Sequence, residues 1–331
     1  MSCRTRAAGS TAVCQARRME STSGTADAGW SRRRFLKVGV GGAAALVVAG
    51  TAGVELVAHG VLPGKQTLDQ LDGSCSVGGA PPHVAAVGPS TSGVFSSRAR
   101  NCRVGYTIAY PPGHGRGSVL PLIVMLHGFG GDHTNALTGL SPAQAVALQV
   151  GGRPLAPMAM VTVDGGGGYW NPHPGDDPMG MVVDELLPMC QRLGLGAGPQ
   201  RIGTMGVSMG GYGALRLAER YPGRFAAVAA ISPAIWTSYD EAHGANSGAF
   251  ASHESFLAND VIRHVGRLDG TPVRIASGAD DPFHPGVEAL AQVVPSSATV
   301  VVAAGCHTGP FFSSQQPPSL QFLSRHLTTP V

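Results

Sequence analysis

Long apolar runs, charged residues and aromatic residues are all scarce in this chain of 331 residues. Only 13% of the residues are charged and 6% are aromatic, and the 48 glycines and 25 prolines are scattered without a period. After residue 60, no apolar run approaches the roughly 20 residues that cross a membrane. These features exclude a polytopic membrane protein, a collagen, a coiled coil and a charge-rich disordered chain. What remains is a globular protein, because 43% hydrophobic residues suffice for a sizeable core.

The net charge of +3 is positive only because of the first 37 residues, which hold eight Arg or Lys and two acidic residues, a net charge of +6. The rest of the chain holds 15 basic and 18 acidic residues, a net charge of −3. It has no basic stripe with interleaved aromatics, so we expect no nucleic-acid partner. It also has no CxxC and no Cys/His cluster with zinc spacing, so we expect no metal site.

Residues 31–37, Ser-Arg-Arg-Arg-Phe-Leu-Lys, precede a 17-residue uncharged stretch over 38–54. A basic region followed by a weak apolar segment is an export-signal pattern, and this one resembles a twin-arginine signal. It predicts the twin-arginine export machinery as a partner, and a secreted, periplasmic or envelope-associated protein. Small residues at 50–52 or at 57–58 offer cleavage sites, but an uncleaved leader would instead tether the protein to a membrane. Met19 is an alternative start.

Six cysteines have to be placed, and Cys3 and Cys14 precede the signal. The other four allow three pairings in an oxidising compartment. We favour Cys75–Cys102, which would tie the segment before residue 100 to the first strand. Cys306 is alternatively a buried free thiol beside His307.

The composition predicts three regions: a leader over 1–58, a Gly/Pro/Ser-rich linker or wrapping segment over 59–100, and a catalytic domain over 101–331. Within the last region, short apolar runs alternate with helical patterns, which is typical of a buried parallel sheet. The sequence therefore predicts a doubly wound, mostly parallel α/β fold with helices on both faces. The predicted strands are 104–109, 120–126, 158–163, 202–207, 225–231, 273–276 and 299–304. The predicted helices lie near 141–149, 178–193, 209–221, 251–265, 285–293 and 317–327.

Ser208 is the predicted nucleophile, within Gly206-Val207-Ser208-Met209-Gly210. This G-x-S-x-G motif joins a predicted strand to a predicted helix, which is the context the motif needs. In that strained turn the hydroxyl points out of the sheet at a helix N-terminus, which favours developing negative charge.

His127-Gly128-Phe129-Gly130-Gly131 follows an earlier strand and predicts an oxyanion hole. We assign the backbone N–H groups of Phe129 and Met209 as donors, with Gly130 as second choice. His127 precedes the serine in the chain, so we expect it to brace this loop rather than to act as the base.

His307 is the predicted base, because it follows the last strand and the order Ser, acid, His is typical of this kind of site. The candidate acids are Asp280 and Asp281, at the end of the preceding strand. We favour Asp281, which lies past the tight turn at Gly278 and before Pro282, and keep Asp280 as the alternative. In these roles His307 takes the serine proton and Asp281 orients the imidazole.

Together these motifs resemble the esterase D and mycobacterial mycolyltransferase-like branch of the α/β-hydrolases, over roughly residues 100–327. The stretches that carry the resemblance are 106–113, 126–131, 164–170, 184–188, 206–213, 278–283 and 305–307. The resemblance implies an α/β-hydrolase fold and a serine esterase, or an acyltransferase of similar mechanism, without a cofactor. Family members often carry a Trp shortly after the catalytic His, where this chain has Phe311 and Phe312.

The substrate pocket is predicted to involve Tyr169, Trp170, Trp236 and Phe311, although the loop at 164–170 is equally consistent with core packing. A short cap is expected over 237–255, which suggests an open cleft. The principal hypothesis is an exported serine esterase acting on small-molecule, lipid or glycolipid esters. Two alternatives remain: an acyltransferase to a sugar or lipid hydroxyl, and a non-catalytic binding protein on a hydrolase scaffold.

Overall fold

A computed structural model describes residues 75, 82–84, 86–197 and 201–327. Apart from Cys75, these residues belong to one compact unit that contains Val77–Val331. The predicted export signal, its cleavage sites, Met19, Cys3 and Cys14 lie outside the described residues. Within the part of the chain that is described, no helix is both long and apolar enough to span a membrane.

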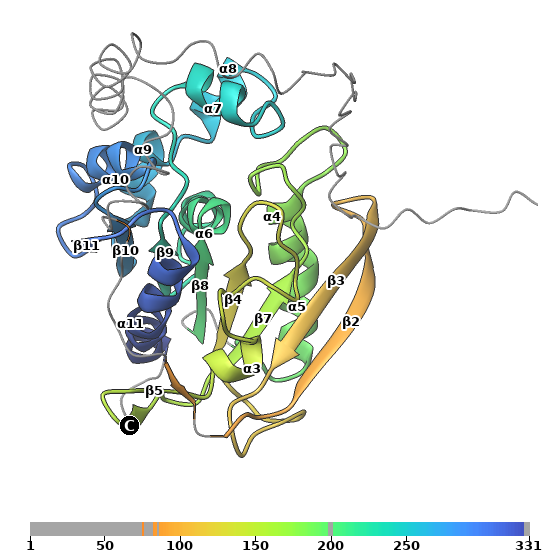
Figure 1. Cartoon of the computed structure of the whole chain (residues 1–331). Helices are drawn as coiled ribbons and strands as arrows, with labels where there is room; N and C mark the ends of the chain where they lie inside the picture. The colour runs from red at the N-terminus through yellow and green to blue at the C-terminus, as the bar shows by residue number, and fades with distance from the viewer. Residues whose placement is uncertain (1–74, 76–81, 85, 198–200, 328–331) are drawn as a thin grey trace, which may run out of the picture. The chain divides into compact units, whose positions relative to one another are not determined.

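The centre of this unit is an eight-stranded sheet with the order β11-β10-β9-β8-β4-β7-β3-β2 (Figure 1). The strands are β2 (Ser90–Ser97), β3 (Cys102–Ala109), β4 (Leu122–Leu126), β7 (Ala159–Val163), β8 (Ile202–Val207), β9 (Ala227–Ile231), β10 (Val273–Gly278) and β11 (Thr299–Ala303). All neighbours pair in parallel except β2 with β3 and β3 with β7. Every residue of β4, β7, β8 and β9 is buried, as expected for strands covered on both faces. The predicted α/β-hydrolase fold is confirmed.

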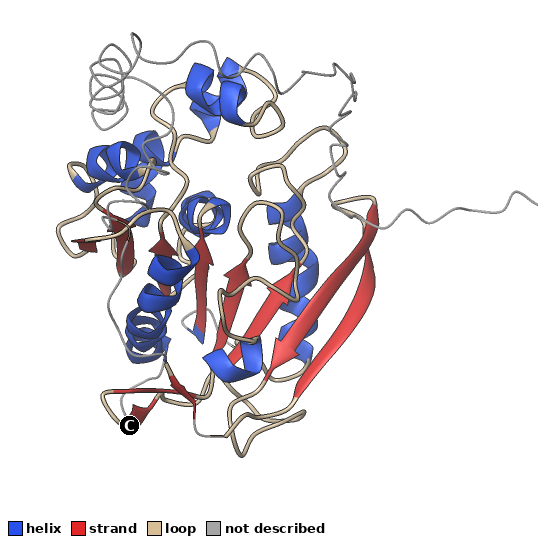
Figure 2. Cartoon of the chain, in the orientation of Figure 1, coloured by secondary structure: helices blue, strands red, loops and turns tan. Residues whose placement is uncertain are grey.

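Helices cover both faces of the sheet (Figure 2). They are α3 (Pro142–Ala145), α4 (Pro178–Gly180), the π-helical η1 (Met181–Leu186), α5 (Leu187–Arg192), α6 (Met209–Arg220), α7 (Tyr239–Ala245), α8 (His253–Ala258), α9 (Val261–His264), the 3₁₀ segment η3 (Val265–Leu268), α10 (His284–Ala291) and α11 (Gly309–Leu327). One face packs against α4–α5 and α6, with Leu122 and Val124 of β4 in its core. The other packs against α3 and α11, with Ile123 and Met125. Alternate residues of β4 thus enter two separate cores, as the period of a strand requires.

Three elements differ from the sequence prediction. Residues 90–97, expected to be irregular, form the edge strand β2, paired in register with β3. Part of the helix expected over 141–149 is instead β5 (Leu148–Val150), which lies between β1 (His83–Val84) and β6 (Arg153–Pro154) in a small antiparallel sheet. The last helix begins at Gly309 rather than near 317 and carries Pro317 and Pro318 inside it.

The described cysteines are divided between bonded and free forms. Cys75, Cys102 and Cys306 are disulfide-bonded, whereas Cys190 is a free, fully buried thiol. The alternative of a free Cys306 thiol is therefore wrong. The Cys75–Cys102 pairing stays a prediction.

Candidate active site

Ser208 lies in a sharp turn between β8 and α6, at the carboxyl edge of the sheet. Its backbone has φ 57° and ψ −122°, a region that residues with a side chain rarely adopt. Three backbone hydrogen bonds hold this conformation: Ser208 N–H donates to Ile231 O, and Ser208 O accepts from the N–H groups of Tyr212 and Ala234. Strain of this kind, held by its surroundings, is typical of a functional position.

Gly210 lets α6 begin close to the end of β4. A Cβ at this position would lie 2.0 Å from Leu126 O and 2.7 Å from His127 O. Both contacts are with backbone, so a side chain could be accommodated only by moving the helix away from the strand. The second glycine of G-x-S-x-G therefore fixes the position of the helix N-terminus relative to the loop at His127.

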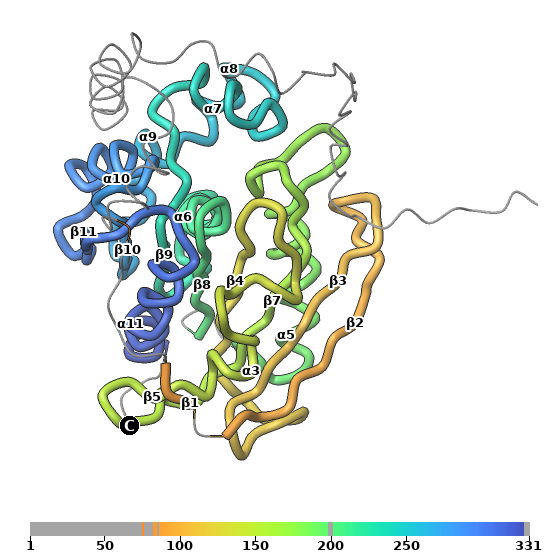
Figure 3. Tube along the Cα trace, viewed as in Figure 1, coloured from red at the N-terminus to blue at the C-terminus, as the bar shows by residue number. Residues whose placement is uncertain are grey.

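Asp281 and His307 come from the loops after β10 and β11. These strands are parallel neighbours, so the two loops leave the same edge of the sheet, as the tube in Figure 3 shows. Backbone hydrogen bonds join the loops directly, from Ala279 N–H to Ala303 O and from Asp280 N–H to Gly305 O. Two side chains 26 positions apart in the sequence are thereby brought together.

A continuous line of hydrogen bonds connects the three side chains. His307 Nε2 lies 2.8 Å from Ser208 Oγ, and His307 Nδ1 lies 2.9 Å from Asp281 Oδ2. The Asp281 side chain is fully buried and that of His307 is 17% exposed. The other carboxylate oxygen of Asp281 accepts the Phe283 N–H at 2.9 Å, so the acid is oriented from both sides. The structure thus brings the favoured acid, Asp281 rather than Asp280, to the imidazole.

The loop after β4 passes beside Ser208. A Cβ on Gly128 would lie 3.3 Å from Val207 O and 3.6 Å from Ser208 Cβ. Among the hydrogen bonds of the described residues, the N–H groups of Phe129 and Met209 donate to no protein acceptor. Two free amide donors beside the serine are what an oxyanion hole requires. Gly130, the second choice, follows in the same turn.

His127 is almost fully buried and both of its ring nitrogens contact backbone. Gly165 N–H donates to Nε2 at 2.8 Å, so Nε2 carries no proton, and Nδ1 lies 2.8 Å from Gly128 O. Burial lowers the pKa of this imidazole, although the Gly128 carbonyl and nearby carboxylates partly oppose the shift. The neutral ring bridges the oxyanion loop and the loop at Gly165, as the sequence led us to expect.

Trp170 does not line an open pocket. Its side chain is fully buried beside His127, with ring centroids 5.0 Å apart, and its Nε1–H donates to His127 O. The prediction of a pocket role is therefore wrong for Trp170, and the alternative of core packing holds. The four glycines at 165–168 instead let this loop pack closely: a Cβ on Gly165 would lie 2.3 Å from the Trp170 ring, and one on Gly166 2.8 Å from Arg100 Nη2.

Phe311 is also fully buried, and its predicted place in the pocket is wrong as well. Because residues 311 and 312 lie in α11, successive side chains point about 100° apart, and it is Phe312 that contacts His307. Phe283 contacts the same imidazole, with ring centroids 5.0 Å apart, against 4.9 Å for Phe312. The sequence analysis missed both contacts, although Phe283 lies only two residues from Asp281.

Trp236 and Tyr169 extend the group of aromatic rings that Phe283 and Phe312 form around His307. The Trp236 ring meets Phe283 edge-on at 4.7 Å, and its Nε1–H donates to the Tyr169 hydroxyl at 3.2 Å. Tyr169 is 5% exposed and Trp236 is half-buried. Trp236 therefore lies one ring away from His307, and Tyr169 lies two rings away.

A small cap follows Trp236 and runs to Ala258, three residues beyond the predicted range of 237–255. It contains α7 and α8, which lie in Figure 1 on the side toward which the parallel strands point. Tyr212 of α6 ties the cap down, since its hydroxyl contacts both Asn171 Oδ1 and Asn259 O. Among the described residues, no group of three or more His, Cys, Asp or Glu side chains could hold a metal ion.

Comparisons with known proteins agree with this geometry. The family model described as "Putative esterase" matches residues 97–307, more than half of the chain. The chain is 21% identical to a ferulic acid esterase of known structure, with a TM-score of 0.60 over 72% of this chain and 99% of that one. An S-formylglutathione hydrolase from Agrobacterium tumefaciens is 17% identical, with a TM-score of 0.57 over 75% and 98%. The fluorophosphonate-binding serine hydrolase FphF from Staphylococcus aureus is 14% identical, with a TM-score of 0.58 over 72% and 99%. At these identities the likeness shows the fold, and curated proteins give no significant match.

Proposed function

Because the chain belongs to the esterase family and is a carboxylic ester hydrolase, we propose that it is an exported serine esterase that forms an acyl-enzyme on Ser208. The observation that carries this proposal is the line of hydrogen bonds from Asp281 through His307 to Ser208, at 2.9 Å and 2.8 Å. Nucleophile, base and orienting acid are each within the reach that proton transfer needs.

In the first half of the reaction, Ser208 Oγ attacks the ester carbonyl while its proton passes to His307 Nε2. The neutral hydroxyl is otherwise a poor nucleophile at pH 7. Asp281 holds the Nδ1–H tautomer and stabilises the imidazolium that forms. His307 then gives the proton to the leaving alcohol, and water repeats the sequence in reverse to release the acid.

The N–H groups of Phe129 and Met209 are proposed to bind the tetrahedral oxyanion. One such donor is worth about 3 kcal/mol of transition-state stabilisation. The buried His127 supports this role, since its bonds to Gly128 and Gly165 hold the loop that carries Phe129. Preorganised donors need no rearrangement when the charge develops.

The substrate is proposed to present an apolar group to this site. Phe129, whose backbone belongs to the proposed oxyanion loop, is 65% exposed, and its ring lies beside Gly167. At the triad itself, Phe283 and Phe312 flank His307. These aromatic surfaces favour esters with an aryl or alkyl chain, including lipid and glycolipid esters, over small polar esters.

Export is supported by two independent features. The leader carries a twin-arginine pattern, and three of the four described cysteines are disulfide-bonded, which is compatible with an oxidising compartment.

The test is hydrolysis of 4-nitrophenyl esters of rising acyl length, with and without sugar acceptors. We expect kcat/KM to rise with chain length for the wild type and to be lost in Ser208→Ala, but not in Ser96→Ala, which removes an exposed hydroxyl from β2. Phe129→Ala should raise KM for long esters about tenfold and leave acetate nearly unchanged, because about 1.4 kcal/mol of apolar contact is lost. Acyl groups found mainly on the sugar would instead identify a transferase.

A further inference from the structure

A second pocket lies far from the triad, between β3 and the end of α5. Its volume is about 250 Å³, and its lining includes Tyr106 and Ile108 of β3, Tyr110 just after that strand, and Met189, Arg192 and Leu193 at the end of α5. Because β3 runs antiparallel to β7, Tyr110 lies toward the amino ends of the parallel strands. Ser208 lies at their carboxyl ends, so the two sites are at opposite edges of the sheet.

The polar groups of this pocket lack protein partners. Tyr110 is 4% exposed, yet within the described ranges its hydroxyl makes no hydrogen bond. The Tyr110 oxygen is not among the buried side-chain atoms of the described residues that lack a partner, so the hydroxyl opens into the pocket and is free to bond a molecule bound there. The hydroxyl of Tyr106, on the same face of β3, likewise has no bond to a described residue.

Two arginines add positive charge to the same space. Arg116 and Arg192 both line the pocket at its exposed rim, and neither is ion-paired with a carboxylate of any described residue, so both guanidinium groups are available to a bound molecule. Burial, and next the Cys190 thiol, raise the pKa of Tyr110, while the Arg116 charge lowers it, so the guanidinium and the phenol are close enough to interact. Arg192 lies in the last turn of α5, where a cation favours the helix end. That role does not apply to Arg116, which lies outside any helix.

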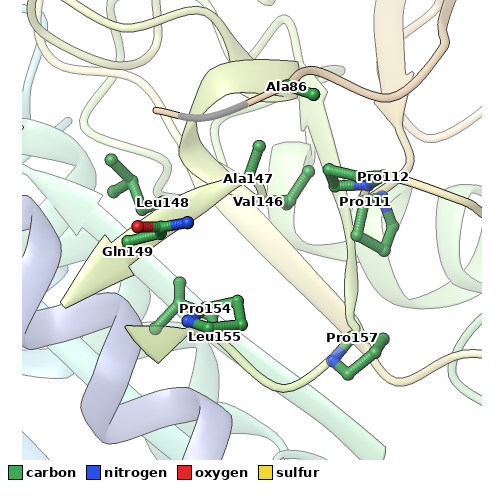
Figure 4. Close-up of a pocket in the computed structure, with 10 residues that line it drawn as sticks. All are labelled: Ala86, Pro111, Pro112, Val146, Ala147, Leu148, Gln149, Pro154, Leu155 and Pro157. Atoms are coloured by element: carbon green, nitrogen blue, oxygen red, sulfur yellow. The ribbon is translucent and has the colours of Figure 1, made fainter. Parts of the chain in front are cut away.

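A comparison with another pocket shows what is particular here. The pocket in Figure 4 is larger, about 350 Å³, but apart from Gln149 its lining is apolar and rich in proline. It offers no charge with which to choose a ligand. The pocket at Tyr110 combines an apolar floor of Ile108, Met189 and Leu193 with two guanidinium groups and two phenols.

We propose that this pocket binds a small organic anion, a carboxylate or phosphate on an aryl or short alkyl group. The anionic oxygens would accept hydrogen bonds from Arg116, Arg192 and the Tyr110 hydroxyl, and the apolar part would rest on Ile108 and Met189. Guanidinium groups suit such oxygens because their donors form a planar fork.

The test is binding of 4-fluorobenzoate, followed by ¹⁹F NMR, to protein whose active site has been blocked with a fluorophosphonate. The block removes the catalytic cleft as a competing site. We expect saturable binding that is unchanged by the block and about tenfold weaker for neutral 4-fluorobenzyl alcohol. A 4-fluorophenyl phosphate arm reports whether phosphate is preferred over carboxylate, and inorganic phosphate alone should bind more weakly than either.

Matched variants locate the site. Arg116→Gln combined with Arg192→Gln should weaken binding at least about tenfold, and Tyr110→Phe, which removes one oxygen and keeps the ring, about threefold. Arg103, an exposed residue of β3 outside this pocket, provides the control, and Arg103→Gln should change nothing. Ester hydrolysis by unblocked protein should be the same in all these variants, so failure here is distinguishable from failure of the esterase proposal. Absence of saturable binding, or equal binding by the double variant, would overturn the inference.

Discussion

Two histidines follow strands of the same sheet edge and lie on either side of Ser208, yet they have opposite surroundings. His127, after β4, is buried and bonded to two backbone groups, Gly128 O and Gly165 N–H. His307, after β11, is partly exposed and bonded to a carboxylate and a hydroxyl. Partners, rather than residue type or position along the edge, thus separate a structural histidine from a candidate base.

The comparison has an electrostatic basis. A carboxylate beside Nδ1 stabilises the imidazolium that proton transfer creates, whereas burial beside backbone groups disfavours it. Protonation of His127 would also lose the Gly165 bond, because Nε2 could no longer accept. The first environment favours a base and the second a neutral brace.

The largest expected effect is the loss of the base. His307→Ala should lower kcat about 10⁵-fold, because the nucleophile and its base act as one unit. The fold should persist, since this side chain touches solvent and other loop bonds remain. Steady-state kinetics with a 4-nitrophenyl ester and a thermal melt measure the two properties. A variant that keeps more than a tenth of wild-type turnover would remove His307 from the mechanism.

The next effect tests the partner of that base. Asp281→Asn should lower kcat about 10³- to 10⁴-fold, because the amide favours the wrong imidazole tautomer. Asp280→Asn is the matched control, one residue away, and should leave kcat within a few-fold of wild type. The same ester assay decides between them. Greater damage from the Asp280 variant would reassign the acid.

His127→Phe should act mainly on stability. The change leaves the Gly165 N–H and the Gly128 carbonyl without their side-chain partner inside the protein, which costs about 2–4 kcal/mol of unfolding free energy. Turnover by the folded variant should fall far less than in His307→Ala. Urea unfolding and active-site-titrated kinetics measure both properties. If His127→Phe were as stable as wild type but inactive, the two histidines would not differ as described.

The smallest effect concerns pH. Burial lowers the pKa of His127 in the folded protein below its ordinary value of 6.5, so the unfolded chain binds this proton more readily. The stability contributed by neutral His127 is therefore present above pH 6.5 and declines as the pH falls below it. The difference in unfolding free energy between wild type and His127→Phe should shrink between pH 7.5 and pH 5.5. Other shifted groups, such as His264 and Glu219, are common to both proteins and cancel. A constant or growing difference would contradict this pKa direction.

The sequence predicted the sheet well where burial alone determines a strand. The runs that became β4, β7, β8 and β9 are apolar on both faces, a pattern that needs little information from the rest of the chain. β2 was missed because Ser90–Ser97 is mostly polar and becomes a strand only by pairing with β3. The start of α11 was missed because prolines usually mark a first turn, whereas Pro317 and Pro318 lie inside this helix.

The candidate triad was also predictable, since motif order along the chain identified Ser208, Asp281 and His307 and the structure brings them together. The aromatic rings around His307 were harder to predict from the sequence. Whether Trp170 packs inward, and whether Phe311 or Phe312 meets His307, depends on backbone direction at those positions, which residue identity does not encode. Tyr169 and Trp170, for example, both have a positive φ, and this backbone conformation decides where their side chains point.

The central claim is a covalent intermediate on Ser208. Mixing the protein with a slowly deacylated 4-nitrophenyl ester, quenching in acid within milliseconds and mapping the adduct by mass spectrometry tests it directly. The account predicts a stoichiometric burst of nitrophenol and one acyl group on the peptide that contains Ser208, absent from Ser208→Ala. Rapid turnover of the ester with no adduct there, or an adduct on another side chain, would contradict it.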